Sequence, residues 1–203
     1  MNFNNLIKSI MAGICIGIGG VIYLTTEDHV VGGVLFSLGL LTIYSFGFNL
    51  YTGKCCTFLE NPKKNIMLIL NSLIGNFIGT ALVGYTLRLS ELSIIEKSVE
   101  AVEGKFSHSL LATFILAIFC GIMMSIAVLG YKKQTSDFGR FIIIALPVTI
   151  FIAAKFEHSI ADMFYISLAN KWSISALIFI LVCAAGNFVG CNIISVAEKI
   201  TSK

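Results

Sequence analysis

Four ionisable side chains lie close together inside an apolar stretch that begins near Phe141. They are Lys155, Glu157, His158 and Asp162. A histidine gains and loses a proton near neutral pH, so His158 could pass a proton to the anion of a weak acid or hold a charge that attracts one. The other interpretation is structural: the histidine only stabilises a break in a helix through hydrogen bonds. Ionisable groups are costly inside a bilayer and commonly mark a substrate pathway, which favours the functional interpretation.

A second polar group interrupts the apolar stretch 30–59 at residues 47–53. It contains Asn49, Thr52 and Lys54. Unwound backbone exposes helix N-termini, whose partial positive charge attracts anions. Non-helical backbone at membrane depth persists only where it is buried in protein or lines a water-filled cavity. The two breaks together therefore indicate a pore.

Composition places both breaks in a membrane. Hydrophobic residues make up 57% of the 203 residues and charged residues only 12%, whereas a soluble domain of this length needs a larger polar surface. The apolar residues occur in long blocks, and a helix needs about 20 of them to cross a bilayer. The first block, 6–26, is expected to be a retained span rather than a cleaved signal peptide, because further spans follow at once. The net charge of +3 is not gathered in a basic stripe, which argues against a nucleic-acid partner.

Hydropathy predicts an all-α polytopic membrane protein with six transmembrane helices. The second and fifth helices are broken, at residues 47–53 and 155–158. A long polar stretch, 88–109, separates the third span from the fourth and contains a short surface helix. The predicted spans cover residues 6–26, 30–59, 66–87, 110–131, a segment that starts near 141, and 172–197.

Lysine and arginine residues are unevenly divided between the two sides of this predicted bundle. The side richer in these residues is expected to be cytoplasmic, which puts both termini inside the cell and the protein in the cell membrane. Lys155 belongs to neither side, because it falls within the fifth span. The richer side has Lys8, Lys54, Lys63, Lys64, Lys132, Lys133, Arg140, Lys199 and Lys203, and the other has Arg88, Lys97, Lys105 and Lys171.

A short motif occurs twice. Residues 75–79 read GNFIG and residues 186–190 read GNFVG, each in the last span of one half of the chain. Small residues at this spacing let helices approach closely, and that alone could explain them. Three spans in each half would also give the halves opposite orientations, as in inverted-repeat transporters. The expected layout is one transmembrane domain over 1–203, with repeat halves 1–88 and 109–203 joined by the polar loop 89–108.

Residues 156–164 read FEHSIADMF and resemble the FEHSxANMF motif of formate/nitrite transporters. Other segments agree in order with this family. Residues 33–40 resemble the first half of its second helix, and residues 50–53 (LYTG) resemble its LFTG-type omega loop. Residues 103–105 resemble the start of its fourth helix, and the two Gly-Asn-x-x-Gly motifs match its third and sixth helices. The resemblance covers nearly the whole chain.

The resemblance implies a homopentamer in which each aquaporin-like protomer has its own pore. It implies passage of small monovalent anions such as formate, nitrite or hydrosulfide, coupled to protons, with no cofactor and no metal. His158 would be the central pore histidine, beside Glu157, and Thr52 would face it. Lys105 would be the vestibule lysine that attracts anions. The hydrophobic constrictions would be formed by Phe36, Leu40 and Phe151, with Leu50 and Tyr51 at the omega loop.

Three positions depart from the family pattern. Gly121 aligns with an asparagine that commonly contacts the histidine, Lys155 stands where a glycine is usual, and Asp162 stands where an asparagine is usual. We therefore expect altered selectivity or pH response rather than a closed pore. Two interpretations of the new charges remain: Lys155 and Asp162 pair with each other, or both face an interface between protomers.

Other functional classes fit the sequence less well. An aquaporin-like channel for a neutral small solute is the main alternative, but neither Pro62 nor Pro147 lies in an Asn-Pro-Ala motif. A membrane enzyme is not expected, since the chain has no HExxH motif and no nucleophile elbow.

A metal carrier is disfavoured because the histidines at 29, 108 and 158 have no ligand spacing. The six cysteines form no CxxC pair and are interpreted as small, reduced, buried residues.

Overall fold

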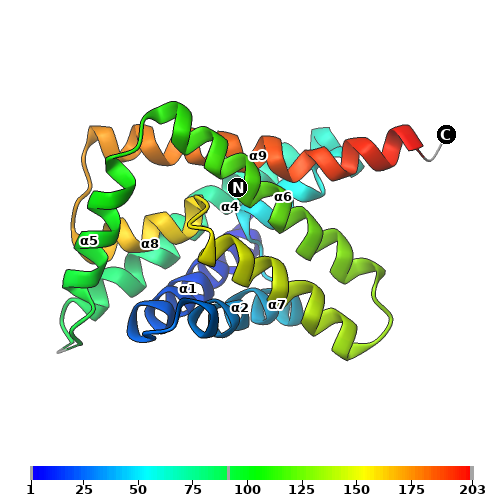
Figure 1. Ribbon diagram of the computed structural model, residues 1–203. Helices are drawn as coiled ribbons and strands as arrows, with labels where there is room; N and C mark the ends of the chain where they lie inside the picture. Colours follow the sequence, from blue (N-terminus) through cyan, green and yellow to red (C-terminus); the bar gives the residue numbers. More distant parts are fainter. Residues whose placement is uncertain (1, 91, 202–203) are drawn as a thin grey trace.

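The computed structural model describes residues 2–90 and 92–201, and the regular elements in these ranges are helices. Figure 1 shows them as a bundle in which α5 lies across one end, away from the C-terminus. The elements are α1 (Phe3–Thr25), α2 (His29–Phe46), α3 (Tyr51–Cys56), η1 (Phe58–Glu60), α4 (Pro62–Leu87), α5 (Ile95–Phe106), α6 (Leu110–Lys133), α7 (Asp137–Ala153), α8 (Ser159–Ala169) and α9 (Ile174–Thr201).

Five of these helices, α1, α2, α4, α6 and α9, are long and apolar enough to cross a bilayer. The fifth predicted span is divided into α7, of 17 residues, and α8, of 11 residues. The second predicted span is likewise divided into α2 and the short α3. The prediction of an all-helical protein with several membrane spans is confirmed, and the surface helix expected in the polar stretch is α5.

Both helix breaks coincide with left-handed backbone. Gly47 ends α2 with φ of 66°, a conformation that glycine adopts without the steric cost of a Cβ atom. Lys155 follows α7 with φ of 55°, which is unfavourable for a residue with a side chain. The chain leaves each break in extended conformation, at Leu50 before α3 and at His158 before α8.

The long helices pack in two groups. α1 packs on α2 and α4, α6 packs on α7 and α9, and α2 joins the groups by packing on α7. The short α3 and α8 lie inside, where α3 touches α4, α6 and α9 while α8 touches α1, α4, α5 and α9. The two breaks are therefore enclosed by protein, as backbone without helical hydrogen bonds requires in a membrane.

Glycines allow the closest helix contacts. A Cβ atom on Gly79 of α4 would lie 2.1 Å from the Ile10 carbonyl oxygen, and one on Gly190 of α9 would lie 2.0 Å from the Ile118 carbonyl oxygen. Gly121 belongs to the second contact, because a Cβ atom there would lie 2.4 Å from the Asn187 carbonyl oxygen. With this backbone an asparagine side chain does not fit at position 121.

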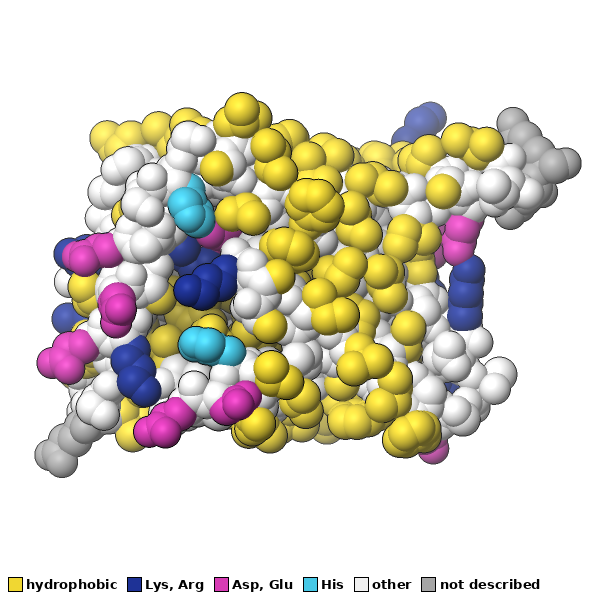
Figure 2. Space-filling model, in the orientation of Figure 1, with side chains coloured by type: hydrophobic (Ala, Val, Ile, Leu, Met, Phe, Trp, Pro, Cys, Tyr) yellow, Lys and Arg dark blue, Asp and Glu magenta, His cyan; other side chains and the backbone are white. Residues whose placement is uncertain are grey.

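The surface agrees with a membrane environment. Figure 2 shows hydrophobic side chains over the middle of the molecule and charged side chains gathered at its two ends. Exposed residues such as Leu35, Leu82, Leu111 and Leu181 come from four of the long helices. An apolar surface this extensive is typical of a protein that faces lipid or other subunits.

Candidate functional site

The two helix breaks meet at a hydrogen bond between His158 and Thr52. The Nε2 atom of His158 lies 3.2 Å from the Oγ1 atom of Thr52, and both side chains are buried. Thr52 is the second residue of α3, and His158 immediately precedes α8. The structure thus brings together two residues that are 106 positions apart, in the arrangement that the family resemblance implies.

The hydrogen bond at the second ring nitrogen of His158 determines which tautomer the neutral ring adopts. The backbone N–H of Ala161 donates to Nδ1 at 3.2 Å, so the side chain caps the N-terminus of α8. A nitrogen that accepts a hydrogen bond carries no proton, and a neutral imidazole then has its proton on the other nitrogen. The neutral form therefore carries its proton on Nε2, which donates to Thr52. Protonating Nδ1 would remove the cap of α8.

Apolar side chains surround the histidine. The Phe151 ring stacks on the His158 ring with centroids 5.5 Å apart, and Phe36 packs edge-on against Phe151 at 6.3 Å. All five residues that the sequence assigned to constrictions are buried: Phe36, Leu40, Leu50, Tyr51 and Phe151.

An asparagine in the second Gly-Asn-x-x-Gly motif holds the His158 break. The Asn187 Oδ1 atom accepts from the backbone N–H of Ser159 at 2.9 Å. Its Nδ2 group donates to the backbone carbonyl oxygens of Ala117 and Glu157 at 2.9 and 2.8 Å. This side chain satisfies the Ser159 N–H and the Glu157 carbonyl oxygen, which the interrupted helix leaves unpaired, and ties them to α6 through Ala117.

An asparagine in the first motif makes the same set of bonds at the other break. The Asn76 Oδ1 atom accepts from the backbone N–H of Tyr51 at 2.8 Å. Its Nδ2 group donates to the carbonyl oxygens of Ser9 and Asn49 at 2.7 and 2.9 Å. The sequence analysis found these motifs but missed that their asparagines hold the breaks. The sequence did contain a signal for this role: each half has an asparagine at the matching place of an apolar span.

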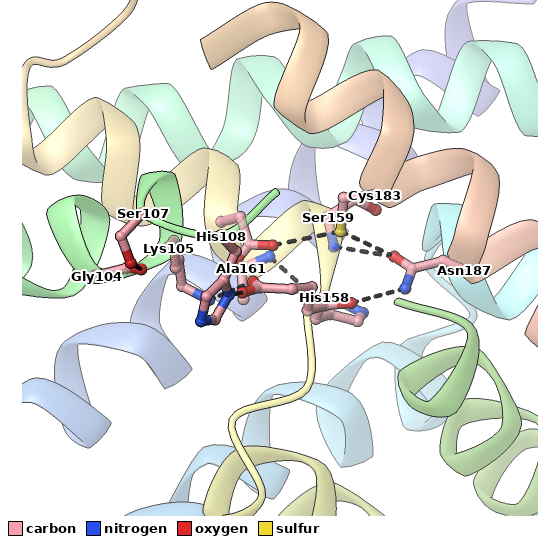
Figure 3. Close-up of polar contacts among 11 residues, drawn as sticks. Gly104, Lys105, Ser107, His108, His158, Ser159, Ala161, Cys183 and Asn187 are labelled. Carbon is pink, nitrogen blue, oxygen red and sulfur yellow. Dashed lines mark hydrogen bonds and ion pairs between the residues drawn. The ribbon is translucent and has the colours of Figure 1, made fainter. Parts of the chain in front are cut away.

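A lysine between two carboxylates lies beside the histidine. The Lys105 Nζ atom is 2.5 Å from Oε2 of Glu157 and 2.9 Å from Oδ1 of Asp162, and both acidic side chains are only 1% exposed. Cys183 donates its thiol hydrogen to Oδ2 of Asp162 at 3.4 Å. Figure 3 shows Lys105 and His108, which come from the region of α5, approaching the start of α8.

These contacts determine the charge state of Lys105. Burial by itself would lower the pKa of the Lys105 ammonium, but Asp162 and Glu157 outweigh burial and raise this pKa above its usual value. Lys105 is therefore positively charged. With two carboxylates around one ammonium, the cluster has a net negative charge when both acids are ionised.

Neither interpretation of the pair Lys155 and Asp162 describes the structure. Asp162 binds Lys105 instead of Lys155, and it is buried inside the protomer rather than facing an interface. Lys155 is exposed at the border of a cavity. The reason is geometric: α8 begins between these residues and turns Asp162 inward, towards α5.

Two cavities lie on opposite sides of the constriction residues. The larger, of about 630 Å³, is bordered by Phe36, Phe151 and His158 at its narrow end. Figure 2 shows it as a hollow edged by histidine side chains at the end of the molecule that contains α5. The smaller, of about 250 Å³, is bordered by Ile43 and Leu50 and contains Lys54.

No cluster of histidine, cysteine, aspartate or glutamate residues suited to a metal ion occurs in residues 2–90 and 92–201. The six cysteines are unpaired and buried. The chemistry that the site offers is therefore that of an enclosed histidine, a threonine hydroxyl and a charged cluster: hydrogen bonding, proton transfer and electrostatic attraction.

Comparisons with known proteins give a consistent result. A family model described as formate/nitrite transporter matches residues 2–198. The formate channel FocA of Haemophilus influenzae is 29% identical over 187 residues, which are 81% of this chain and 66% of that protein. The formate channel BtFdhC of Bacillus thuringiensis is 34% identical over 151 residues, which are 68% of this chain and 58% of that protein. The match thus spans two thirds or less of the length of these curated relatives.

Solved structures share the fold. One described as a pentameric formate channel with formate bound aligns with a TM-score of 0.83 and 21% identity, over 99% of this chain and 98% of that one. One described as an FNT family ion channel aligns with a TM-score of 0.87 and 17% identity, over 98% of this chain and 90% of that one.

Proposed function

The chain belongs to the formate/nitrite transporter family, and from this we propose that it passes small monovalent anions of weak acids across the cell membrane together with protons. The class includes formate, nitrite and hydrosulfide. The hydrogen bond between His158 and Thr52, enclosed by apolar side chains between two cavities, is the observation that carries the proposal.

The apolar surroundings explain why protons are needed. Moving an isolated charge out of water into an apolar passage costs far more than thermal energy, so a bare anion does not cross between Phe36, Leu40 and Leu50. Adding a proton converts the anion to a neutral acid and removes most of that cost. A charged anion such as chloride, whose acid stays ionised at physiological pH, has no such route.

His158 supplies the proton in two steps. An anion that reaches the constriction accepts a hydrogen bond from Nε2–H, and its negative charge favours protonation of the ring at Nδ1. The imidazolium, which has taken its Nδ1 proton from water, then gives its Nε2 proton to the anion and leaves a neutral acid and a neutral ring protonated on Nδ1. Loss of the Nδ1 proton to water and uptake of a proton at Nε2 restore the starting tautomer, in which Nδ1 accepts from the Ala161 N–H. Because protonation of Nδ1 breaks its bond to the Ala161 N–H, the charged ring is a transient state that forms only beside an anion.

The arrangement of the chain completes the proposal. Matching bonds of Asn76 and Asn187 support two inverted repeats, α1–α4 and α6–α9, with an aquaporin-like protomer. The distribution of lysine and arginine supports cytoplasmic termini. The exposed apolar surface supports a homopentamer with one pore in each protomer.

Ion flux in proteoliposomes tests the proposal. Formate, nitrite, hydrosulfide, acetate and chloride are compared across a pH series, for the wild type and for His158→Asn. We expect passage of the weak-acid anions, exclusion of chloride, and loss of pH dependence in the variant, because asparagine does not titrate. Passage of water or a neutral solute without any anion would overturn the proposal in favour of a neutral-solute channel.

A further inference from the structure

The smaller cavity contains a lysine that no part of the proposed proton pathway uses. Lys54 lies two residues after Thr52 in α3, and it borders the 250 Å³ cavity together with Lys132, Glu60 and Leu50. Its side chain is half-buried. Leu50 is also one of the proposed constriction residues. Lys54 therefore lies in the cavity directly beside the point where the passage narrows.

The charges around Lys54 leave its ammonium without an acidic partner. Lys132 binds the carboxylate of Glu60 at 2.8 Å, which neutralises both groups. Among residues 2–90 and 92–201, no hydrogen bond or ion pair holds the Lys54 ammonium.

The larger cavity has the opposite charge. Three lysines and four carboxylates border it, which gives a formal net charge of −1 with neutral histidines. Two lysines and one carboxylate border the smaller cavity, which gives +1. Lys105, the lysine nearest to His158 in the larger cavity, is already bound by two carboxylates. Lys155 also borders the larger cavity without an ion pair among the described residues, but its side chain is exposed, where solvent screens its charge. The half-buried ammonium without an acidic partner therefore lies on the Lys54 side.

We propose that the cavity beside Lys54 is a binding site for a small monovalent anion, which waits there before it passes Leu50. This inference rests on the proposed function, since the bound anion is the one that permeates. A water molecule occupies about 30 Å³ of liquid, so 250 Å³ accommodates an anion of a few atoms with part of its hydration shell. In such partly enclosed surroundings, the attraction between an anion and an ammonium is stronger than it is in bulk water.

The site makes the two entrances unequal. An anion arriving from the Lys54 side meets an ammonium without an acidic partner, whereas one arriving from the Lys105 side meets a lysine that two acidic side chains already bind. The half-saturating anion concentration is therefore lower on the Lys54 side. Electrostatic attraction of this kind weakens with rising ionic strength.

Flux measured separately from each side tests the site. Membrane vesicles of both orientations are used, and labelling of Lys63→Cys by an impermeant maleimide identifies the side that faces out. We expect Lys54→Met to raise the half-saturating formate concentration about fivefold to tenfold from the Lys54 side only. Lys54→Arg keeps the charge and should stay within about twofold of the wild type. Lys63→Met, which removes an exposed lysine outside the cavity, should change nothing.

A binding measurement separates this inference from the proposed function. The lysines of the full chain are reductively methylated with ¹³C, and the Lys54 signal is assigned by its loss in Lys54→Met. We expect saturable movement of this signal with sodium formate, but not with the salt of a bulky organic anion at equal ionic strength. Equal movement of the Lys54 and Lys63 signals, or unchanged flux in Lys54→Met, would overturn the site. Saturable binding without any anion flux would support the site and overturn the proposed function.

Discussion

At the scale of single residues, Asp162 has the largest electrostatic consequence. Its side chain binds Lys105. An asparagine at this position would leave Glu157 as the acidic partner of that lysine. A buried carboxylate so close to the histidine opposes the approach of an anion from the larger cavity. Under the proposed function, the residue that departs from the family pattern is therefore expected to alter how strongly one entrance attracts an anion.

Replacing Asp162 by asparagine should strengthen anion entry from the Lys105 side. The change keeps the shape of the side chain and removes the negative charge that Asp162 carries when it is ionised, so we expect the half-saturating formate concentration on that side to fall about threefold. Glu100→Gln is the matched control, because it removes an exposed carboxylate at the border of the same cavity, where solvent screens charge. A fall of the same size in both variants would mean that net charge alone matters.

At the scale of helices, two features hold the interrupted elements: the asparagines at the breaks and the glycines at the long-helix contacts. Neither feature touches the proposed path of the anion directly. Both act through backbone positions, since Asn187 orients the start of α8 and Gly190 allows α6 and α9 to approach.

Removing the Asn187 amide should destabilise the protein. Asn187→Leu leaves the Ser159 N–H and the Glu157 carbonyl oxygen at the break without partners in a buried place, and each such group costs about 1–3 kcal/mol. We expect a loss of roughly 3–5 kcal/mol in unfolding free energy, visible as a lower thermal transition in detergent. Asn192→Leu is the control, because Asn192 lies on the same helix and bonds only within it. Equal losses in the two variants would show that the hydrogen bonds from Asn187 to the His158 break add no more stability than the bond that Asn192 makes within α9.

Adding a methyl group at the α6–α9 contact should also destabilise the protein. In Gly190→Ala the new Cβ atom meets the Ile118 carbonyl oxygen at 2.0 Å, and overpacking of this kind typically costs about 1–3 kcal/mol. Gly104→Ala is the control, since no atom lies within 4 Å of a Cβ atom there. A lower melting temperature for Gly190→Ala alone supports the contact, and unchanged melting of both variants would contradict it.

At the scale of the whole molecule, the constriction is made by residues from elements that are far apart in the chain. Phe36 comes from α2, Leu50 precedes α3, and Phe151 comes from α7. They separate a cavity with net negative charge from one with net positive charge. The selectivity proposed here would therefore depend on how the two halves of the chain fit together.

Widening the constriction should reduce the discrimination against chloride. Phe36→Ala removes a fully buried ring that packs against Phe151, so that water can enter and lower the cost of an unprotonated anion. We expect chloride flux to become measurable and the pH dependence of formate flux to weaken. Phe77→Ala, which removes a partly exposed ring on α4 away from both cavities, should preserve chloride exclusion. Continued exclusion in Phe36→Ala would show that this ring is not part of the barrier.

The sequence by itself determined the membrane environment, the helical class and the positions of both breaks. Long apolar blocks, interrupted by polar residues, leave few alternatives in a solvent that cannot pair backbone groups. Family motifs supplied the pairing of the two breaks across the chain.

Only the tertiary structure decided which charges pair. Lys105, Glu157 and Asp162 come from α5, from a break and from α8, and sequence spacing contains no information on such contacts. The same holds for Gly121, where the approach of α9 excludes a side chain, and for Lys54, which combines a half-buried side chain, a place at a cavity and the lack of an ion pair among the described residues. Interactions within a helix follow from spacing, whereas charge pairing between elements depends on how the whole chain packs.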